Sequence, residues 1–144
     1  MIDIMNWNVC VRNFVRKVEV DYSKISSLLK TANLRFRDIN NKKVTEDNVS
    51  SVIEGYYEVI KELLVSLMLA HGFRSKNHQC LISFLYKYYP KYEGESYFIS
   101  QLSFHRNRLN YYGELIDFDF YKLNKKKVFD IVDLLNKLVQ DKIK

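Results

Sequence analysis

The sequence has few of the residues that turn or interrupt a chain. Its 144 residues include one proline and four glycines. An all-β fold of this size needs many tight turns, and tight turns draw heavily on glycine and proline. The long stretches rich in leucine, lysine, glutamate and isoleucine have good helix propensity instead. The composition therefore predicts an all-α protein.

Cysteine is also scarce, because Cys10 and Cys80 are the only two and no CxxC spacing occurs. Neither a disulfide framework nor a zinc knuckle is indicated by such a pair. We expect both residues to be small thiols that line the core. His71 and His78 lie near Cys80 in the sequence but lack a suitably spaced fourth ligand, so we predict no metal site and no cofactor.

Long apolar runs are missing throughout. No stretch of about 20 apolar residues occurs, and about that length is needed to cross a bilayer. Residues 1–14 contain no apolar run of the length typical of a secretory signal, and they carry an acid at Asp3. We therefore expect a cytoplasmic protein with no membrane partner.

The chain carries a modest surplus of positive charge. Lys and Arg number 23 against 17 Asp and Glu, which gives a formal charge of +6. Such a charge favours contact with polyanions such as RNA, but surplus lysine is equally typical of a solvated surface. No single basic tract dominates, since the four lysines of 122–127 are mixed with apolar residues. The charge permits RNA binding without specifying it.

Apolar spacing of three and four residues predicts one domain over 1–144, an up-and-down bundle of five or six helices. Residues 2–14 suit a short helix, although the alternation of valines from Val9 to Val20 also suits extended chain. Asp21 or Ser23 can cap a helix that continues to residue 39. The polar run 40–43 ends it.

The remaining helices are predicted from their end signals. Thr45 is expected to open the longest helix, about 26 residues, which would form the spine of the bundle and end before Gly72. A shorter helix lies between Asn77, a capping residue, and Pro90, which stops it. The next spans about 94–112, with Gly113 at its end, and after an acidic bend at 117–119 a final helix buries the apolar positions from 128 to 139.

A polar strip lies on the helix expected at 94–112. Arg106 and Asn110 are four residues apart, as are Asn107 and Tyr111, so the four side chains fall on one side of the helix. A guanidinium and two carboxamides are suited to holding the oxygens of a phosphodiester. Arg and Asn are also common on solvated helix faces and in hydrogen-bonded subunit contacts, and the spacing alone favours that simpler interpretation.

The same segment resembles the signature of the HEPN family, an arginine, usually a polar residue, and a histidine five positions after the arginine. Here Arg106 and Asn107 are followed by Tyr111 in the place of the histidine. Upstream, residues 54–64, the His71-Gly72-Phe73 turn and the Asn77-His78 cap resemble the long helix and loop of archaeal members. The resemblance covers about residues 21–113.

Membership in that family would imply a homodimer in which two copies of this helix face each other across a cleft. In active members the arginine and histidine cut RNA without a metal. Tyr111 is a poor replacement, because the ordinary pKa of tyrosine is about 10 and general acid–base catalysis needs a group that titrates near neutrality. We therefore expect a catalytically degenerate RNA- or nucleotide-binding or regulatory subunit of a toxin–antitoxin-like system, with a minimal nucleotidyltransferase as a candidate partner.

The candidate site residues are Arg106 and Tyr111 at the catalytic positions, and Asn107, Asn110 and Arg108 for binding. One alternative is a metal-independent ribonuclease that uses Arg106 with Tyr111 or His105, and another is a structural helical dimer without a nucleic-acid role. His105 shares the apolar face of its helix, which favours a buried, hydrogen-bonded histidine over a relocated base. Arg108 lies about 100° around the helix from its neighbours and is expected to point to solvent.

An acidic row on the longest predicted helix is the last feature of interest. Glu54, Glu58 and Glu62 are spaced by four residues and therefore lie on one face. Such a row is more often solvated or salt-bridged than catalytic. If the bundle brings it near Arg106, it would neutralise the arginine and organise the cleft.

Overall fold

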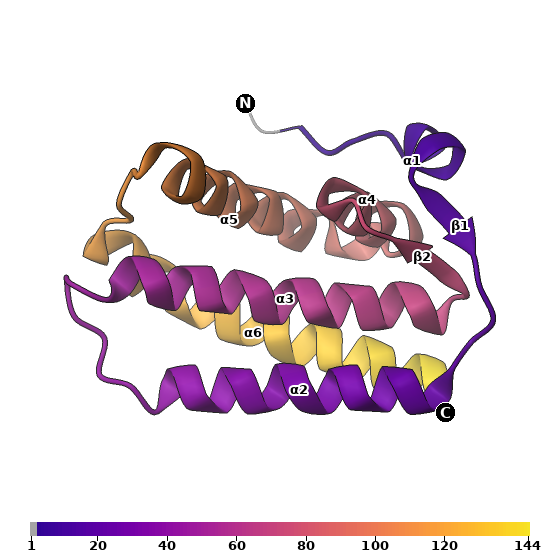
Figure 1. Cartoon of the computed structure of the whole chain (residues 1–144), viewed down its shortest axis with the longest axis horizontal. Coiled ribbons are helices and arrows are strands. Elements are labelled where there is room, and N and C mark those ends of the chain that lie inside the picture. Colours follow the sequence, from indigo (N-terminus) through magenta and orange to yellow (C-terminus); the bar gives the residue numbers. More distant parts are fainter. Residues whose placement is uncertain (1–2) are drawn as a thin grey trace.

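The computed structural model of the protein describes residues 3–144, and their architecture is all-α with one very small sheet (Figure 1). The prediction of a helical bundle is therefore confirmed. The elements, in chain order, are α1 (Trp7–Asn13), β1 (Val15–Lys17), α2 (Tyr22–Asn40), α3 (Val49–Ala70), β2 (Phe73–Ser75), α4 (His78–Tyr88), a 3₁₀ turn η1 (Pro90–Tyr92), α5 (Glu93–Tyr112) and α6 (Phe118–Ile143).

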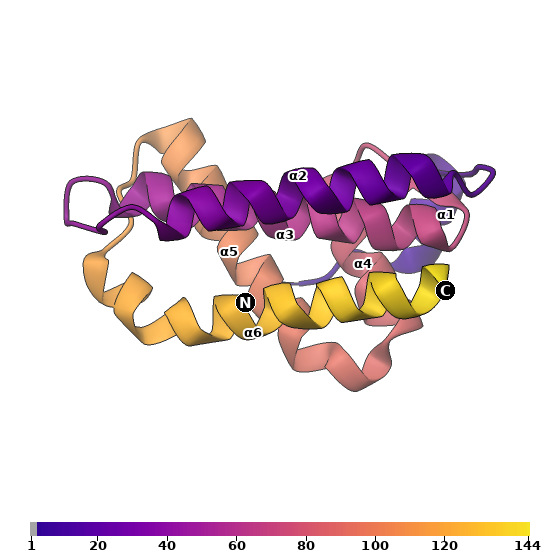
Figure 2. The ribbon, with the colours of Figure 1, turned by 90° about the horizontal axis from the view of Figure 1, so that it is seen from below.

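Helix α3 is the spine of the bundle. It packs against α2, α4, α5 and α6, and most of its side chains are buried. Figures 1 and 2 show α2 and α6 running along α3 while α4 and α5 form a layer on another side of it. Gly55 permits the approach of α2, because a Cβ at that position would lie 2.7 Å from Cδ1 of Ile39. The core therefore surrounds α3.

The predicted start of α3 at Thr45 is wrong. The helix begins at Val49, because Thr45 and Asn48 close a turn in front of it: Thr45 N donates to Asn48 Oδ1 at 2.8 Å, and Asn48 N donates to Thr45 Oγ1 at 3.3 Å. With 22 residues α3 spans about 33 Å, and α6, with 26 residues, is the longer helix.

Most other helix ends lie where the end signals predict them. The Asp21 carboxylate accepts from Lys24 N at the start of α2, and Asn77 Oδ1 accepts from Gln79 N and Cys80 N at the start of α4. Gly72 and Gly113 follow their helices at φ 81° and 66°, the left-handed region that glycine adopts easily. The acidic bend is shorter than expected, because Asp117 caps α6 and Asp119 already belongs to its first turn.

The N-terminal segment combines both of the conformations that its sequence suits. Part of it forms the short helix α1, and β1 then pairs antiparallel with β2 in the register Val15↔Ser75, Arg16↔Arg74 and Lys17↔Phe73. Ile2, included in the predicted helix, lies outside the described residues. Three-residue strands are too short to leave a readable alternation, so the sheet is not predictable from the sequence.

Cys10 and Cys80 form a disulfide, so the prediction of two thiols is wrong although both residues are fully buried as expected. They lie 70 residues apart in sequence, and the pairing of β1 with β2 brings α1 beside α4. The Met5 sulfur lies 3.4 Å from Cys10 Sγ and 3.7 Å from Cys80 Sγ. The bond thus fastens α1 to the bundle.

None of the helices within residues 3–144 combines the length and the apolar character needed to span a bilayer.

Candidate functional site

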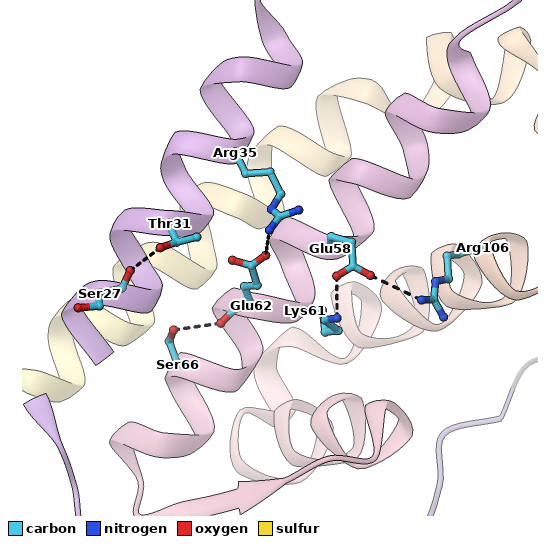
Figure 3. A network of polar contacts seen from close by, with 8 residues as sticks. All are labelled: Ser27, Thr31, Arg35, Glu58, Lys61, Glu62, Ser66 and Arg106. Carbon is cyan, nitrogen blue, oxygen red and sulfur yellow. Dashed lines mark hydrogen bonds and ion pairs between the residues drawn. The ribbon is translucent and has the colours of Figure 1, made fainter. Parts of the chain in front are cut away.

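Arg106 lies on α5 and reaches across the seam towards α3 (Figure 3). Its Nη2 is 3.6 Å from Glu58 Oε1, its Nη1 donates to Asn107 Oδ1 at 3.3 Å, and its guanidinium carbon lies 5.8 Å from the centre of the Tyr57 ring. Its side chain keeps 21% of its surface exposed. The arginine is therefore held against its own bundle while its edge stays accessible.

Two of the three acids in the row on α3, Glu58 and Glu62, are salt-bridged, and Glu54 has no ion pair among the described residues. Glu58 Oε2 also forms an ion pair with Lys61 Nζ at 2.6 Å, and Glu62 pairs with Arg35 of α2 at 3.0 Å (Figure 3). Burial raises the pKa of Glu62, and the charge of Arg35 opposes that shift. Glu62 thus ties α3 to α2, and Glu58 ties α3 to α5 and places a carboxylate beside Arg106.

The hydrogen-bonding capacity of Arg106 is only partly used. Among the described residues, its buried Nε has no hydrogen-bond partner. The contact with Glu58 is longer than a hydrogen bond, and the one with Asn107 is at the long end of the range. Leaving a buried donor unsatisfied costs about 1–3 kcal/mol, so such a group needs an explanation. The guanidinium retains donors that could hold an anion.

His78 is a member of this cluster that sequence reasoning missed. It is the first residue of α4, and its ring centre lies 6.3 Å from that of Tyr57, the residue that Arg106 also contacts. Burial lowers the pKa of His78, the charges of Lys61 and Arg106 lower it further, and Glu58 opposes them. A neutral imidazole near neutral pH can accept a proton. No local spacing links His78 to Arg106, so only the fold reveals their proximity.

Further polar groups connect the helices around Tyr57. Gln79 of α4 donates from Nε2 to the hydroxyl of Ser103 on α5 at 3.2 Å. Burial raises the pKa of Tyr57, while a hydrogen bond with Ser103 and the charge of Arg106 act in the opposite direction. The cluster therefore draws on three helices, and α3 supplies its centre.

Of the predicted site residues, Asn107 is brought to Arg106 but Asn110 and Tyr111 are not. Tyr111 is 74% exposed, Asn110 is exposed, and no hydrogen bond or ion pair among the described residues joins either to Arg106. At about 100° per residue, five positions place Tyr111 about 140° around the helix from Arg106. The strip predicted on one side of α5 is therefore wide, and Arg106 and Tyr111 lie at its two edges.

Arg108 is engaged near the end of α5. Its guanidinium makes a two-pronged ion pair with Glu114, and it lies 5.0 Å from the centre of the Tyr112 ring and 5.6 Å from that of Phe104. The hydrogen bond from Arg108 lowers the pKa of Glu114. Its side chain is 39% exposed, but its charge is already matched by an acid. This lowers its value as a binding residue.

His105 packs against aromatic rings, but it is neither fully buried nor hydrogen-bonded among the described residues, contrary to the prediction. Its ring centre lies 4.6 Å from that of Phe120 and 5.7 Å from that of Phe104. Burial lowers its pKa, and the charge of Glu114 opposes the shift. His105 is only partly buried, and its contacts are those of a packing residue.

No family model matches the chain, and comparisons with curated proteins and with solved structures find no match either. Within residues 3–144, no group of three or more His, Cys, Asp or Glu side chains is arranged to hold a metal ion. The cluster around Arg106 is therefore the candidate functional site.

Proposed function

We propose that this protein is a HEPN-like RNA- or nucleotide-binding or regulatory subunit whose anion-binding group is Arg106. One observation carries the proposal: Arg106 is a partly buried cation with an unpartnered Nε and an exposed edge. A phosphate oxygen would make a charge-assisted hydrogen bond with Nη2, which is not buried, and reaching the buried Nε would require the side chain to move. Asn107 lies beside the guanidinium and adds an amide to the same place.

Glu58 gives this site a built-in competitor. Its carboxylate lies 3.6 Å from Arg106 and is shared with Lys61, so an incoming phosphate has to displace only a long ion pair. Partly exposed pairs of this kind contribute about 0–1 kcal/mol. Breaking the Arg106–Glu58 pair therefore costs little free energy when phosphate binds, and Glu58 weakens phosphate binding by competing for Arg106.

The test is RNA binding by three single variants, measured by fluorescence anisotropy with a labelled single-stranded RNA. Arg106→Ala should weaken binding about tenfold or more, since a hydrogen bond to a charged group contributes about 1.5–3 kcal/mol. Glu58→Gln should strengthen it roughly two- to fivefold, because it releases Arg106 from its partner. Glu62→Gln is the matched control, because it removes an equal charge from the same face of α3 but leaves Arg106 paired.

Equal gains in Glu58→Gln and Glu62→Gln would mean that only net charge matters, and the proposal would fail. Unchanged binding in Arg106→Ala, with its unfolding curve like that of the wild type, would also remove Arg106 as the binding group. Thermal unfolding of each variant separates loss of the site from loss of the fold.

A metal-independent ribonuclease is the second candidate, and the placement of His78 favours it. His78 and Arg106 both adjoin Tyr57, and the shifted pKa of His78 leaves its imidazole neutral near pH 7. Such a pair supplies a proton acceptor and a phosphate-binding cation. His78 is better placed for this role than Tyr111, which lies at the far edge of the strip on α5, or His105, which packs against rings.

Cleavage of a labelled RNA in the presence of a chelator tests this candidate. Activity that is lost in both Arg106→Ala and His78→Gln, but kept in Tyr111→Phe, would establish the ribonuclease over the degenerate subunit. No cleavage by the wild-type protein, together with RNA binding that depends on Arg106, would leave the binding subunit as the function.

The proposed assembly is a homodimer through the end of α5, in a cytoplasmic toxin–antitoxin-like system that includes a minimal nucleotidyltransferase as partner. Exposed apolar residues gather there: Tyr111, Tyr112 and Leu115 are 74%, 71% and 82% exposed. Exposed apolar patches of this kind mark contact surfaces. The same patch would serve the third candidate, a structural helical dimer. A wild-type protein that forms a dimer but does not bind RNA would favour that candidate.

A further inference from the structure

A basic depression lies at the end of the molecule that carries α1 and the small sheet, apart from the cluster around Arg106. It has a volume of about 400 Å³, and four of its lining residues are cations. The lining contains no acid. Figure 1 shows α1, β1 and β2 together beyond α4 at this end. The four cations are Arg12, Arg16, Arg74 and Lys76.

The sheet places two of these cations directly against each other. Arg16 and Arg74 are cross-strand partners in the β1–β2 register. Like charges at opposed positions of an antiparallel pair destabilise the sheet. Neither arginine has an acidic side chain within ion-pair distance among the described residues. Glu19 and Asp21 line a separate depression that Arg74 also borders, together with Lys24.

An exposed aromatic ring completes the lining. Phe14, which follows α1, is 46% exposed and borders the same depression. Cations set beside an exposed aromatic ring suit a single-stranded nucleic acid, because the cations neutralise the backbone and the ring stacks on a base. Free phosphate would use the cations alone and leave Phe14 without a role.

We propose that this depression, the α1–sheet groove, binds the phosphate backbone of single-stranded RNA, with Arg16 and Arg74 sharing phosphates and Phe14 stacking on a base. The opposed arginines are then explained, because an anion between them replaces repulsion by two charge-assisted contacts. The cations and Phe14 that carry this proposal are not residues of the Arg106 cluster, although the groove lining ends at Asn77, next to His78 of that cluster.

The test is anisotropy of a fluorescein-labelled oligouridylate as a function of salt concentration. Arg16→Gln and Arg74→Gln should each weaken binding about threefold to tenfold at low salt. Each should also flatten the plot of log K against log salt by about 0.7, the value for one phosphate contact on a single strand. Lys137→Gln is the matched control, because Lys137 is an exposed cation on α6 outside the groove.

The ring is tested separately. Phe14→Leu keeps an apolar side chain and should weaken binding about fivefold or more, whereas Phe14→Tyr should retain it. Both glutamine variants should unfold at an equal or higher temperature than the wild type, because each relieves the Arg16–Arg74 repulsion. A loss of binding therefore cannot be attributed to unfolding.

The possible outcomes separate the two sites. RNA binding that falls in Arg106→Ala but not in the groove variants overturns the groove, and the reverse pattern overturns the Arg106 site. If Lys137→Gln lowers the RNA affinity as much as Arg74→Gln does, only the net charge of the protein matters, and the proposed groove is overturned. Binding to anionic phospholipid vesicles that depends on Arg16 and Arg74, without RNA binding, overturns the choice of RNA.

Discussion

The three histidines share a setting that disfavours their charged form. His71 contacts three aromatic rings and its Nε2 lies 2.8 Å from the Tyr89 hydroxyl. His78 adjoins Tyr57, and His105 adjoins Phe120. Burial is the largest cause of a lowered pKa for all three. Each imidazole therefore titrates at a lower pH in the folded protein than in the unfolded chain.

This coupling predicts a loss of stability on mild acidification. Because the folded pKa lies below the unfolded value of about 6.5, the histidines contribute their full stability above that pH and lose it as the pH falls through the folded pKa. The free energy of unfolding should therefore decrease between about pH 7 and pH 5. Urea unfolding across that range measures it, with His71→Gln as the variant whose decrease should be smaller. A free energy of unfolding that rises on acidification over this range would contradict the assignment.

At the scale of the elements, helix ends were predictable because their causes are local. Asp21, Asn77 and the two left-handed glycines each act on the chain within a few residues. The start of α3 was not predictable in this way, because the turn closed by Thr45 and Asn48 competes with a helix that the same residues could also begin.

Contacts between segments that are distant in the sequence could not be predicted from it. Nothing near Cys10 indicates Cys80, and the strands that bring them together have three residues each. His78 and Arg106 meet for the same reason, through the packing of α4 and α5 on α3. Glu58 is the intermediate case, because its place in an acidic row was visible and only its partner was not.

Among the features that join one element to another, the disulfide is expected to contribute most to the free energy of unfolding. It closes a loop of 70 residues, and the chain-entropy account assigns such a bond about 4 kcal/mol. The double variant Cys10→Ser, Cys80→Ser should therefore unfold on the order of 10 °C lower than the oxidised protein. Its α1 amides should exchange faster, because α1 is short and depends on this tether.

Reductant provides the control for that experiment. Under denaturing conditions, the wild-type protein should show no free thiol until it is reduced, and reduction should shift its unfolding temperature towards that of the double variant. The double variant should not respond to reductant. Two free thiols in the untreated protein would show that the bond is absent in solution, in keeping with the reducing cytoplasm expected from the sequence.

Because Arg12 and Phe14 border the α1–sheet groove from α1 and the residue after it, loosening α1 should also weaken RNA binding there.

At the scale of the whole molecule, the proposed binding and contact surfaces lie on different elements. The α1–sheet groove carries cations at one end, and the exposed apolar residues Tyr111, Tyr112 and Leu115 gather where α5 ends and leads into α6. The Arg106 cluster occupies the seam between α3 and α5. A dimer formed through the end of α5 would leave both α1–sheet grooves free to bind RNA.

Disruption of that apolar patch tests the proposed dimer. Light scattering should give twice the 17.3 kDa of the chain for the wild type, and Leu115→Lys should shift the mass towards one chain by weakening association about tenfold or more, the effect of about 1.4 kcal/mol. Leu123→Lys is the matched control, because Leu123 is 83% exposed but lies on α6. A dimer that survives Leu115→Lys and dissociates in Leu123→Lys would move the interface to α6. A monomeric wild type would remove the shared cleft and leave Arg106 to bind its phosphate within one protomer.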